Sequence, residues 1–145
     1  MIKEQQIVDY LKTIFQTIKT TGGFHTNAGN NVFFDRAEDI SQSKLPAINY
    51  RLGDNKLEEA SSSFAVHTID QDCEIDMLGR TPEEVIQIYA DVIKIIGQNL
   101  KLNNLAITVK RGNAYNEPTD QQGNKVADRR LVVIIKYRTN AWSEE

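Results

Sequence analysis

Side chains that could carry out acid–base, nucleophilic or metal chemistry are few in this sequence. The two histidines, His25 and His67, each lack a second ligand at the i, i+4 spacing of helical metal sites. A nucleophile needs a thiol or hydroxyl beside a base, but Cys73 falls on the apolar face of its predicted strand and is predicted to be buried and inert. The glycines at 22–23 and Gly112 match no phosphate-binding loop. We therefore predict no catalytic residue, no cofactor and no metal ligand, and a protein that is not an enzyme.

An acidic stripe is the most distinctive local pattern. Its four carboxylates alternate with apolar residues, so in a strand they share one face: Asp70, Asp72, Glu74 and Asp76. One interpretation is a solvated sheet face, where they form cross-strand pairs worth about 0.2–1 kcal/mol each. The candidate partners are Arg51, Lys110, Lys136 and Arg138. A second interpretation is a wall that repels anions, and a third is a divalent cation site, although such sites usually take converging ligands from loops.

Two amphipathic helices must position these residues. The first is predicted over residues 3–20, with an apolar stripe at helical spacing, and the glycines at 22–23 end it. The second begins with a capping box at Thr81 and Glu84, has Pro82 at its first position, and ends near Gly97. Its buried stripe is predicted to comprise Val85, Ile88, Tyr89, Val92 and Ile96, widened by Ile86 and Ile93.

The predicted strands follow from alternation of apolar and polar residues. A short strand at 32–34 precedes one at 45–52, which a turn at 53–55 ends. The next strand changes phase between Phe64 and Ile69, which predicts a bulge near 67–68. Strands at 105–109 and 129–138 follow, and the second is apolar on both faces, as expected of a central strand. The fold class is therefore α+β: a mixed, mostly antiparallel sheet of four to five strands with two amphipathic helices on one face.

Residues 112–128 are rich in Asn, Asp, Gln and Gly, and we predict a long unstructured hairpin tip there. Such a loop is uncommon in a compact domain and is usually either functional or disordered in the isolated chain. It is therefore a candidate contact loop for a neighbouring subunit or a tube, through residues Asn113, Tyr115, Asn116, Asp120, Gln122 and Lys125.

Composition limits the remaining classes. The 145 residues predict one domain spanning 1–145, and the net charge of −3, with Lys and Arg spread along the chain, offers no basic footprint for nucleic acid. The longest apolar run, at 131–135, is far shorter than the ~20 residues of a membrane helix, and no signal peptide is expected. One cysteine suits a reducing compartment.

Several features in sequence order resemble the bacteriophage tail terminator family, the tail completion proteins of the minor tail protein U type. They are an N-terminal helix followed by Gly22-Gly23-Phe24, a strand that opens Leu45-Pro46-Ala47-Ile48, a long acidic strand, a capped helix containing Tyr89-Ala90-Asp91-Val92, and a last strand ending Val133-Ile134-Ile135-Lys136-Tyr137-Arg138-Thr139. The likeness covers nearly the whole chain.

The resemblance implies a structural protein without enzymatic activity. Members form a hexameric ring that caps the tail tube, stops its polymerisation and joins tail to head. The implied partners are further copies of the chain, the tail tube protein and a head-completion protein, with no membrane. The implied location is the virion tail, assembled in the bacterial host cytoplasm. DNA passes through the lumen of the ring without specific binding. An acidic wall would repel DNA within the screening distance of ~8 Å at physiological salt.

Two alternatives stay open. One is another phage neck or head-closure component, which shares the small ring-forming style. The other is a small intracellular ligand-binding domain or enzyme with a site made by backbone groups. The oligomeric mass separates the ring-forming proteins from the ligand-binding class.

Overall fold

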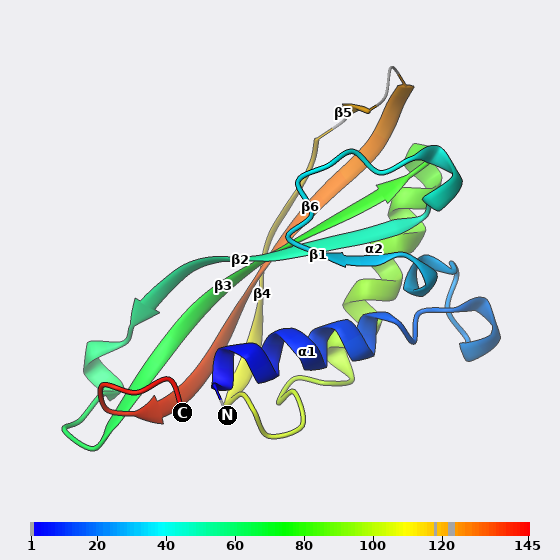
Figure 1. The fold of residues 1–145 in the computed structure, drawn as a ribbon. Helices are drawn as coiled ribbons and strands as arrows, with labels where there is room; N and C mark the ends of the chain where they lie inside the picture. Colours follow the sequence, from blue (N-terminus) through cyan, green and yellow to red (C-terminus); the bar gives the residue numbers. More distant parts are fainter. Residues whose placement is uncertain (1, 118, 122–123) are drawn as a thin grey trace.

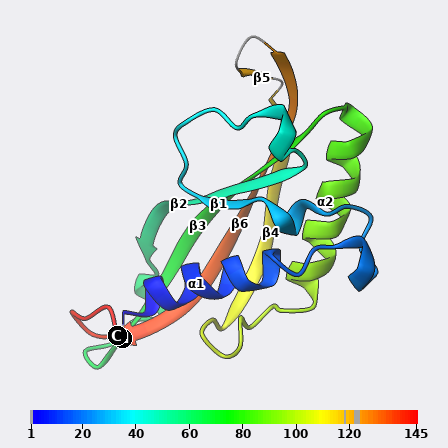
Figure 2. The same cartoon turned by 45° about the vertical axis from the view of Figure 1, so that its right-hand side comes forward.

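The computed structural model describes residues 2–117, 119–121 and 124–145. Its main elements are α1 (Lys3–Phe15), β1 (Val32–Phe34), β2 (Ala47–Leu57), β3 (Val66–Gly79), α2 (Pro82–Gly97), β4 (Thr108–Asn116), β5 (Thr119–Gln121) and β6 (Asn124–Asn140). The sheet has the strand order β1-β2-β3-β6-β4, with β5 beside the far end of β6 (Figure 1). Among the described strands, only β1 and β2 pair in parallel. Both helices contribute to one core cluster on one sheet face (Figure 2), which confirms the predicted α+β fold.

Helix α1 buries the predicted stripe, including Leu11 and Phe15, but it ends at Phe15 and not at residue 20. The apolar pattern continues to the fully buried Ile18, although the chain there has already left the helix. A close contact explains the early end. Gly29 lies against the carbonyls of Phe15, Gln16 and Ile18, where an added Cβ would come within 2.8 Å of each, and its N–H donates to the Ile18 carbonyl.

Helix α2 begins as the sequence predicts. The Thr81 Oγ1 accepts the Glu84 N–H at 3.1 Å, and Pro82 is the first helical residue. The Glu84 carboxylate returns to the N–H of Arg80, one residue before the cap, at 2.9 Å. Val85, Ile88, Val92 and Ile96 are buried as predicted, whereas Ile86 is exposed and does not widen the stripe.

The predicted turn at 53–55 is wrong, because β2 continues to Leu57 through an irregularity between Leu52 and Asn55. Gln71 of β3 explains this continuation. Its buried side-chain amide donates to the carbonyls of Gly53 and Asp54 at 3.0 and 3.2 Å, so these groups are satisfied without a chain reversal.

The predicted bulge at 67–68 is also wrong. Strand β3 pairs in unbroken register with β6 from Val66 to Gly79. The phase change in the sequence arises because Phe64 lies in the preceding turn, where Ser63 donates its N–H to the Val66 carbonyl. The alternation that begins at Ile69 and includes Cys73 is buried as expected.

Most of the described residues in 112–128 belong to β4, β5 and β6, so they do not form the predicted unstructured tip. Strand β4 begins at Thr108, later than predicted, and extends to Asn116 with an irregularity between Arg111 and Ala114. Strand β6 begins at Asn124 and lies between β3 and β4, which confirms its central position. Its 17 residues span about 55 Å at ordinary strand rise. The far ends of β4 and β6, with β5, therefore project beyond the body as an arm (Figure 1).

The sheet face opposite the helices is partly covered. The segment between β1 and β2 folds over it and buries Ile40 and Leu45 on Ala47 and Leu78. The rest of this face carries the acidic stripe. No helix within the described residues is long and apolar enough to cross a membrane.

Candidate functional site

The four carboxylates of the acidic stripe lie on the sheet face opposite the helices. Because β3 pairs with β6 in unbroken register, the four carboxylates lie opposite every second residue of β6: Lys136, Ile134, Val132 and Arg130. The intervening β3 residues Cys73, Ile75 and Met77 point into the core and are fully buried. The alternation in the sequence thus separates one charged face from one apolar face.

Asp76 is the most constrained carboxylate of the stripe. It is buried, and its two oxygens accept hydrogen bonds from Arg130 Nε at 2.7 Å and Arg51 Nη2 at 2.8 Å. The hydrogen bond to Asp76 is also the main reason that the pKa of Arg130 is raised above its ordinary value. Arg51 lies on β2 and Arg130 on β6, so the hydrogen bonds to Asp76 link β2, β3 and β6.

The other three carboxylates differ in pairing. Glu74 lies 3.2 Å from Arg51 Nη1 and 3.7 Å from Arg130 Nη1. Asp70 lies 4.0 Å from Lys136 Nζ, and the pKa of that lysine is raised, chiefly by its hydrogen bond with Glu58. Asp72, beside Gly53, makes no ion pair with any residue that the structure describes.

These contacts match the cross-strand interpretation of the stripe most closely. Arg51 and Lys136 are partners as the sequence suggested, and Arg130, which sequence reasoning missed, is the strongest one. Lys110 and Arg138 pair with no carboxylate in the described part of the chain. Arg51, Arg130 and Lys136 thus offset part of the negative charge of the stripe, and their cross-strand contacts tie β2, β3 and β6 together.

Asp128 is an unexpected buried acid on the same side of the sheet. Its Oδ1 accepts no hydrogen bond from the described residues. Burial, and then the charges of Asp76 and Glu117, raise its pKa to about 7, against the opposing effect of Arg130 and Arg51. Asp128 therefore lies close to half-protonated at neutral pH, although no histidine, lysine or hydroxyl within the described chain pairs with it as a catalytic partner.

The predicted contact loop is distributed along the arm. Asn113 and Tyr115 are exposed on β4, and Asn116 accepts a hydrogen bond from Arg129 Nε at 2.9 Å. Asp120 and Lys125 face each other in the β5–β6 register, with only their backbone described. Gln122 lies outside the described residues. The predicted contact residues that the structure describes therefore all lie on the arm.

The remaining candidates for chemistry are dispersed. Cys73 is fully buried, which raises the pKa of its thiol to about 12 and makes it inert. The ring of His67 contacts the ring of Trp142. His25 lies elsewhere, beside α2, where its backbone N–H donates to Asp91. Among the described residues, no three His, Cys, Asp or Glu side chains converge as a metal site would require.

Asp91 is a buried polar residue that the helical pattern did not reveal. It lies on the buried side of α2, where it accepts the N–H groups of His25 and Thr26, each at 2.9 Å, and the Thr26 hydroxyl at 2.8 Å. The segment after α1 is thereby fixed to α2. A single acid inside an apolar stripe was the only signal in the sequence.

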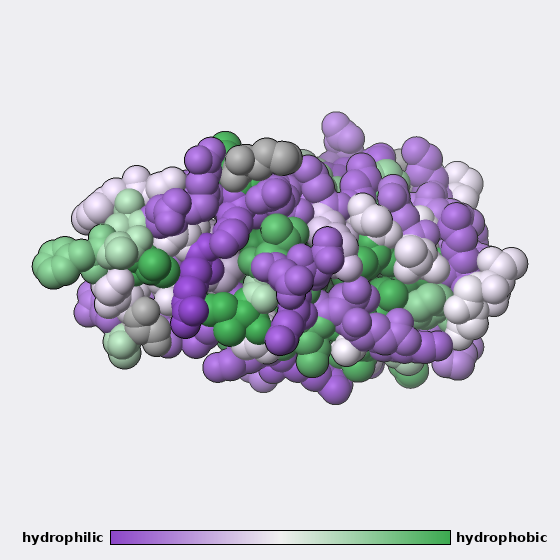
Figure 3. Space-filling model, turned by 90° about the horizontal axis from the view of Figure 1, so that it is seen from below, coloured by the Kyte–Doolittle hydropathy of each residue, from purple (hydrophilic) through white to green (hydrophobic). Residues whose placement is uncertain are grey.

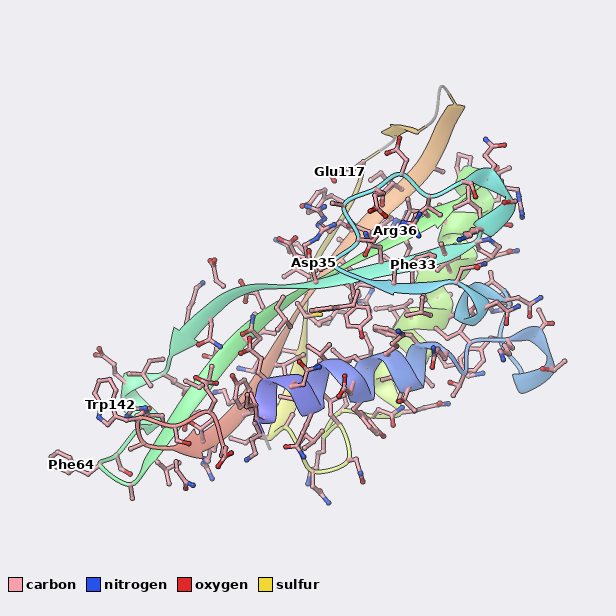
Figure 4. The ribbon with its side chains drawn as sticks, viewed as in Figure 1. Phe33, Asp35, Arg36, Phe64, Glu117 and Trp142 are labelled. Atoms are coloured by element: carbon pink, nitrogen blue, oxygen red, sulfur yellow. The ribbon has the colours of Figure 1, made fainter. Side chains whose placement is uncertain are left out.

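An exposed aromatic tip was also missed. Phe64 and Trp142 extend from one end of the molecule (Figure 4), and Phe64 is fully exposed. Apolar side chains reach the surface at this end in the view from below (Figure 3). A shallow hollow of about 510 Å³ lies beside Trp142 and is bordered by Leu57, Ile69 and Glu144. The out-of-phase position of Phe64 was the signal that could have identified it.

No family model matches the chain, and no curated protein matches its sequence. The function is therefore argued from the residues and their geometry.

Proposed function

We propose that this chain is a structural protein of the phage tail terminator type, which assembles as a six-membered ring on the end of a tail tube. The ring stops tube polymerisation and joins the tail to the head. Its partners are further copies of itself, the tail tube protein and a head-completion protein, and DNA passes through it without specific binding.

The projecting arm carries this proposal. A ring subunit needs a rigid body and an extension that reaches a neighbour or a tube. Near the end of β4, Asn113, Ala114, Tyr115 and Asn116 are exposed, and the strand has no partner on its outer edge within the described chain. An unpaired strand edge with exposed side chains is a ready surface for protein contacts.

The chemistry of the body supports a mechanical role. The Asp76 network ties three adjacent strands together, and the described residues present no convergent metal ligands or nucleophile–base pair. Rigid charge networks on a sheet are costly to deform, which suits a subunit that transmits force between tube and head. The net charge of −3 also opposes tight binding of passing DNA.

Oligomeric mass tests the proposal first. Sedimentation of the purified chain over a wide concentration range, together with electron micrographs of the heaviest species, should show closed rings with six subunits. A chain that forms no ring in solution should still form one at the tube end if the proposal holds. Rings with another subunit number, or a monomer that binds a small ligand, would favour a different neck protein or a ligand-binding domain.

A further inference from the structure

Two aromatic side chains at the tip are almost entirely exposed to solvent. Trp142 is 94% exposed and has a φ of 58°, a backbone conformation that side chains other than glycine rarely adopt. Phe64 is fully exposed, and its turn adjoins Trp142 because the Ala141 N–H donates to the Ala65 carbonyl. Large aromatic side chains dominate protein interfaces because they bury much area with little loss of side-chain entropy.

A groove elsewhere on the same chain has the size to accept one of these rings. It lies between α2 and β4 and is lined by Ile93, Ile96, Gly97, Leu100, Val109, Arg111 and Val133. Its volume is about 140 Å³. An apolar cavity of about 150 Å³ is large enough to bind a benzene ring. Gly97 keeps the groove open, since a Cβ built there would meet nothing within 4 Å.

The charges around the two surfaces are complementary. Glu144 borders the hollow beside Trp142 at the tip. Arg111 lines the groove and donates to the Tyr89 hydroxyl at 2.6 Å, and the Arg129 guanidinium lies on the ring of the same tyrosine, 4.8 Å from its centre. The carboxylate of Glu144 on one surface and the guanidinium of Arg111 on the other favour their mutual approach.

We propose that the tip of one copy docks into the α2–β4 groove of the next copy, with the Phe64 ring inserted in the groove. The tip lies at the end of the β2–β3 turn and the groove beside α2, on different parts of the molecule (Figures 1 and 4). The contact therefore joins two different patches, which is the heterologous geometry that generates rings or helical chains. This inference rests on the proposed ring and names the surfaces that form it.

A membrane is the other occupant that exposed aromatic residues could meet. The tip carries acidic side chains, including Glu144 and the C-terminal Glu145, and the anionic surface of a bilayer repels such groups. The groove on the same chain offers both an apolar hollow and positive charge. The second copy is therefore the favoured partner.

Two variants test the contact from its two sides. Phe64→Ser removes the inserted ring without touching the core, and Gly97→Leu fills the groove from an open helical position. The controls are Phe34→Ser, which removes a phenylalanine that is 42% exposed and packs on Tyr50, and Gln98→Leu, which places the same side chain on the exposed C-cap residue just after α2. Thermal melting of each monomer shows that the fold is retained.

Sedimentation at protein concentrations up to ~1 mM measures self-association, because a contact with a dissociation constant above ~1 mM has little specific affinity. The wild type and both controls should assemble, while each test variant alone should associate about tenfold or more weakly. An equimolar mixture of Phe64→Ser and Gly97→Leu should form a dimer and nothing larger, because only one intact tip and one intact groove remain. The fluorescence of Trp142, the one tryptophan of the chain, should shift to shorter wavelength as the wild type assembles.

Other outcomes overturn the inference. Assembly that survives in both variants places the interface elsewhere and leaves the proposed ring intact. A mixture that stays monomeric, or a wild type that stays monomeric throughout, also overturns the tip–groove contact. Binding of the wild type to phosphatidylcholine vesicles that Phe64→Ser abolishes, without self-association, would assign the tip to membranes. The proposed function fails separately, if the chain is absent from tail ends in electron micrographs.

Discussion

Arg130 of β6 holds Asp76 of β3 with two parallel hydrogen bonds, from Nε to Oδ1 at 2.7 Å and from Nη2 to Oδ2 at 3.2 Å. Arg51 approaches the same carboxylate from β2 on the other side. The guanidinium fork matches the two carboxylate oxygens, which makes such pairs stronger and more directional than a lysine contact. The charged stripe is therefore anchored at its Asp76 end.

Replacing Asp76 should destabilise the fold strongly. In Asp76→Ala two arginines lose their shared, buried partner, and removing one member of a buried pair typically costs about 3–5 kcal/mol. Chemical denaturation of the variant and the wild type measures the difference. Asp72→Ala is the matched control, because Asp72 lies on the same face without an ion pair among the described residues, and we expect a change within about 0.5 kcal/mol. Equal losses in both variants would contradict the anchoring role of Asp76.

Asp128 should make stability fall as pH rises toward neutrality. Its pKa is about 7 in the folded chain and 3.8 in a free side chain, so between these values the folded state binds more protons than the unfolded state. Stability from this group is thus fully present below about pH 4 and is lost as pH rises through about 7.

Asp128→Asn removes that dependence. Relative to wild type, the variant should be more stable at about pH 8, by an amount on the order of 1–4 kcal/mol, and nearly equal at about pH 4. Thermal melts at both pH values measure the two differences. A variant that is less stable at the higher pH would show that the folded chain uses the charged form.

Asp91 should be essential for the segment that follows α1. Asp91→Ala leaves two backbone N–H groups and the Thr26 hydroxyl without an acceptor in a buried place, at about 1–3 kcal/mol for each group left unpaired. Asp91→Asn keeps one oxygen and should lose less. Urea denaturation ranks the three proteins. Equal stability of the alanine and asparagine variants would argue against the hydrogen bonds as the cause.

The helix cores should respond to loss of volume. Leu11 is 2% exposed and Val92 fully buried, so Leu11→Ala should cost about 2–5 kcal/mol. Val92→Asp places an unpaired charge in the same core and should unfold the chain outright. Circular dichroism during thermal melting checks both. The exposed Ile86→Ala on α2 provides a control with little expected change.

Local patterns in the sequence correctly predicted those elements that neighbouring residues determine. The Thr81–Glu84 cap, the alternation around Cys73 and the helical stripe through Leu11 each follow from neighbouring residues, and each was found. The errors have causes that lie far away in sequence. Gln71 satisfies the carbonyls that would otherwise suit a turn at 53–55, and Gly29 ends α1 by its contact with the Phe15 carbonyl.

The charge network shows the same limit. The sequence placed four carboxylates on one face, but their partners depend on strand register. Arg130 meets Asp76 because residues 127–140 of β6 pair with β3, while β4 pairs with the other side of β6 as far as Asn116. The buried state of Asp128 follows from the same register. No local pattern carried that information.

Electron microscopy of the purified chain mixed with purified tail tubes tests the central claim most directly. The proposal predicts a ring of six subunits at one end of each tube, and tubes that no longer lengthen when more tube protein is added. Bare tube ends in the presence of excess chain, or tubes that continue to grow, would contradict it.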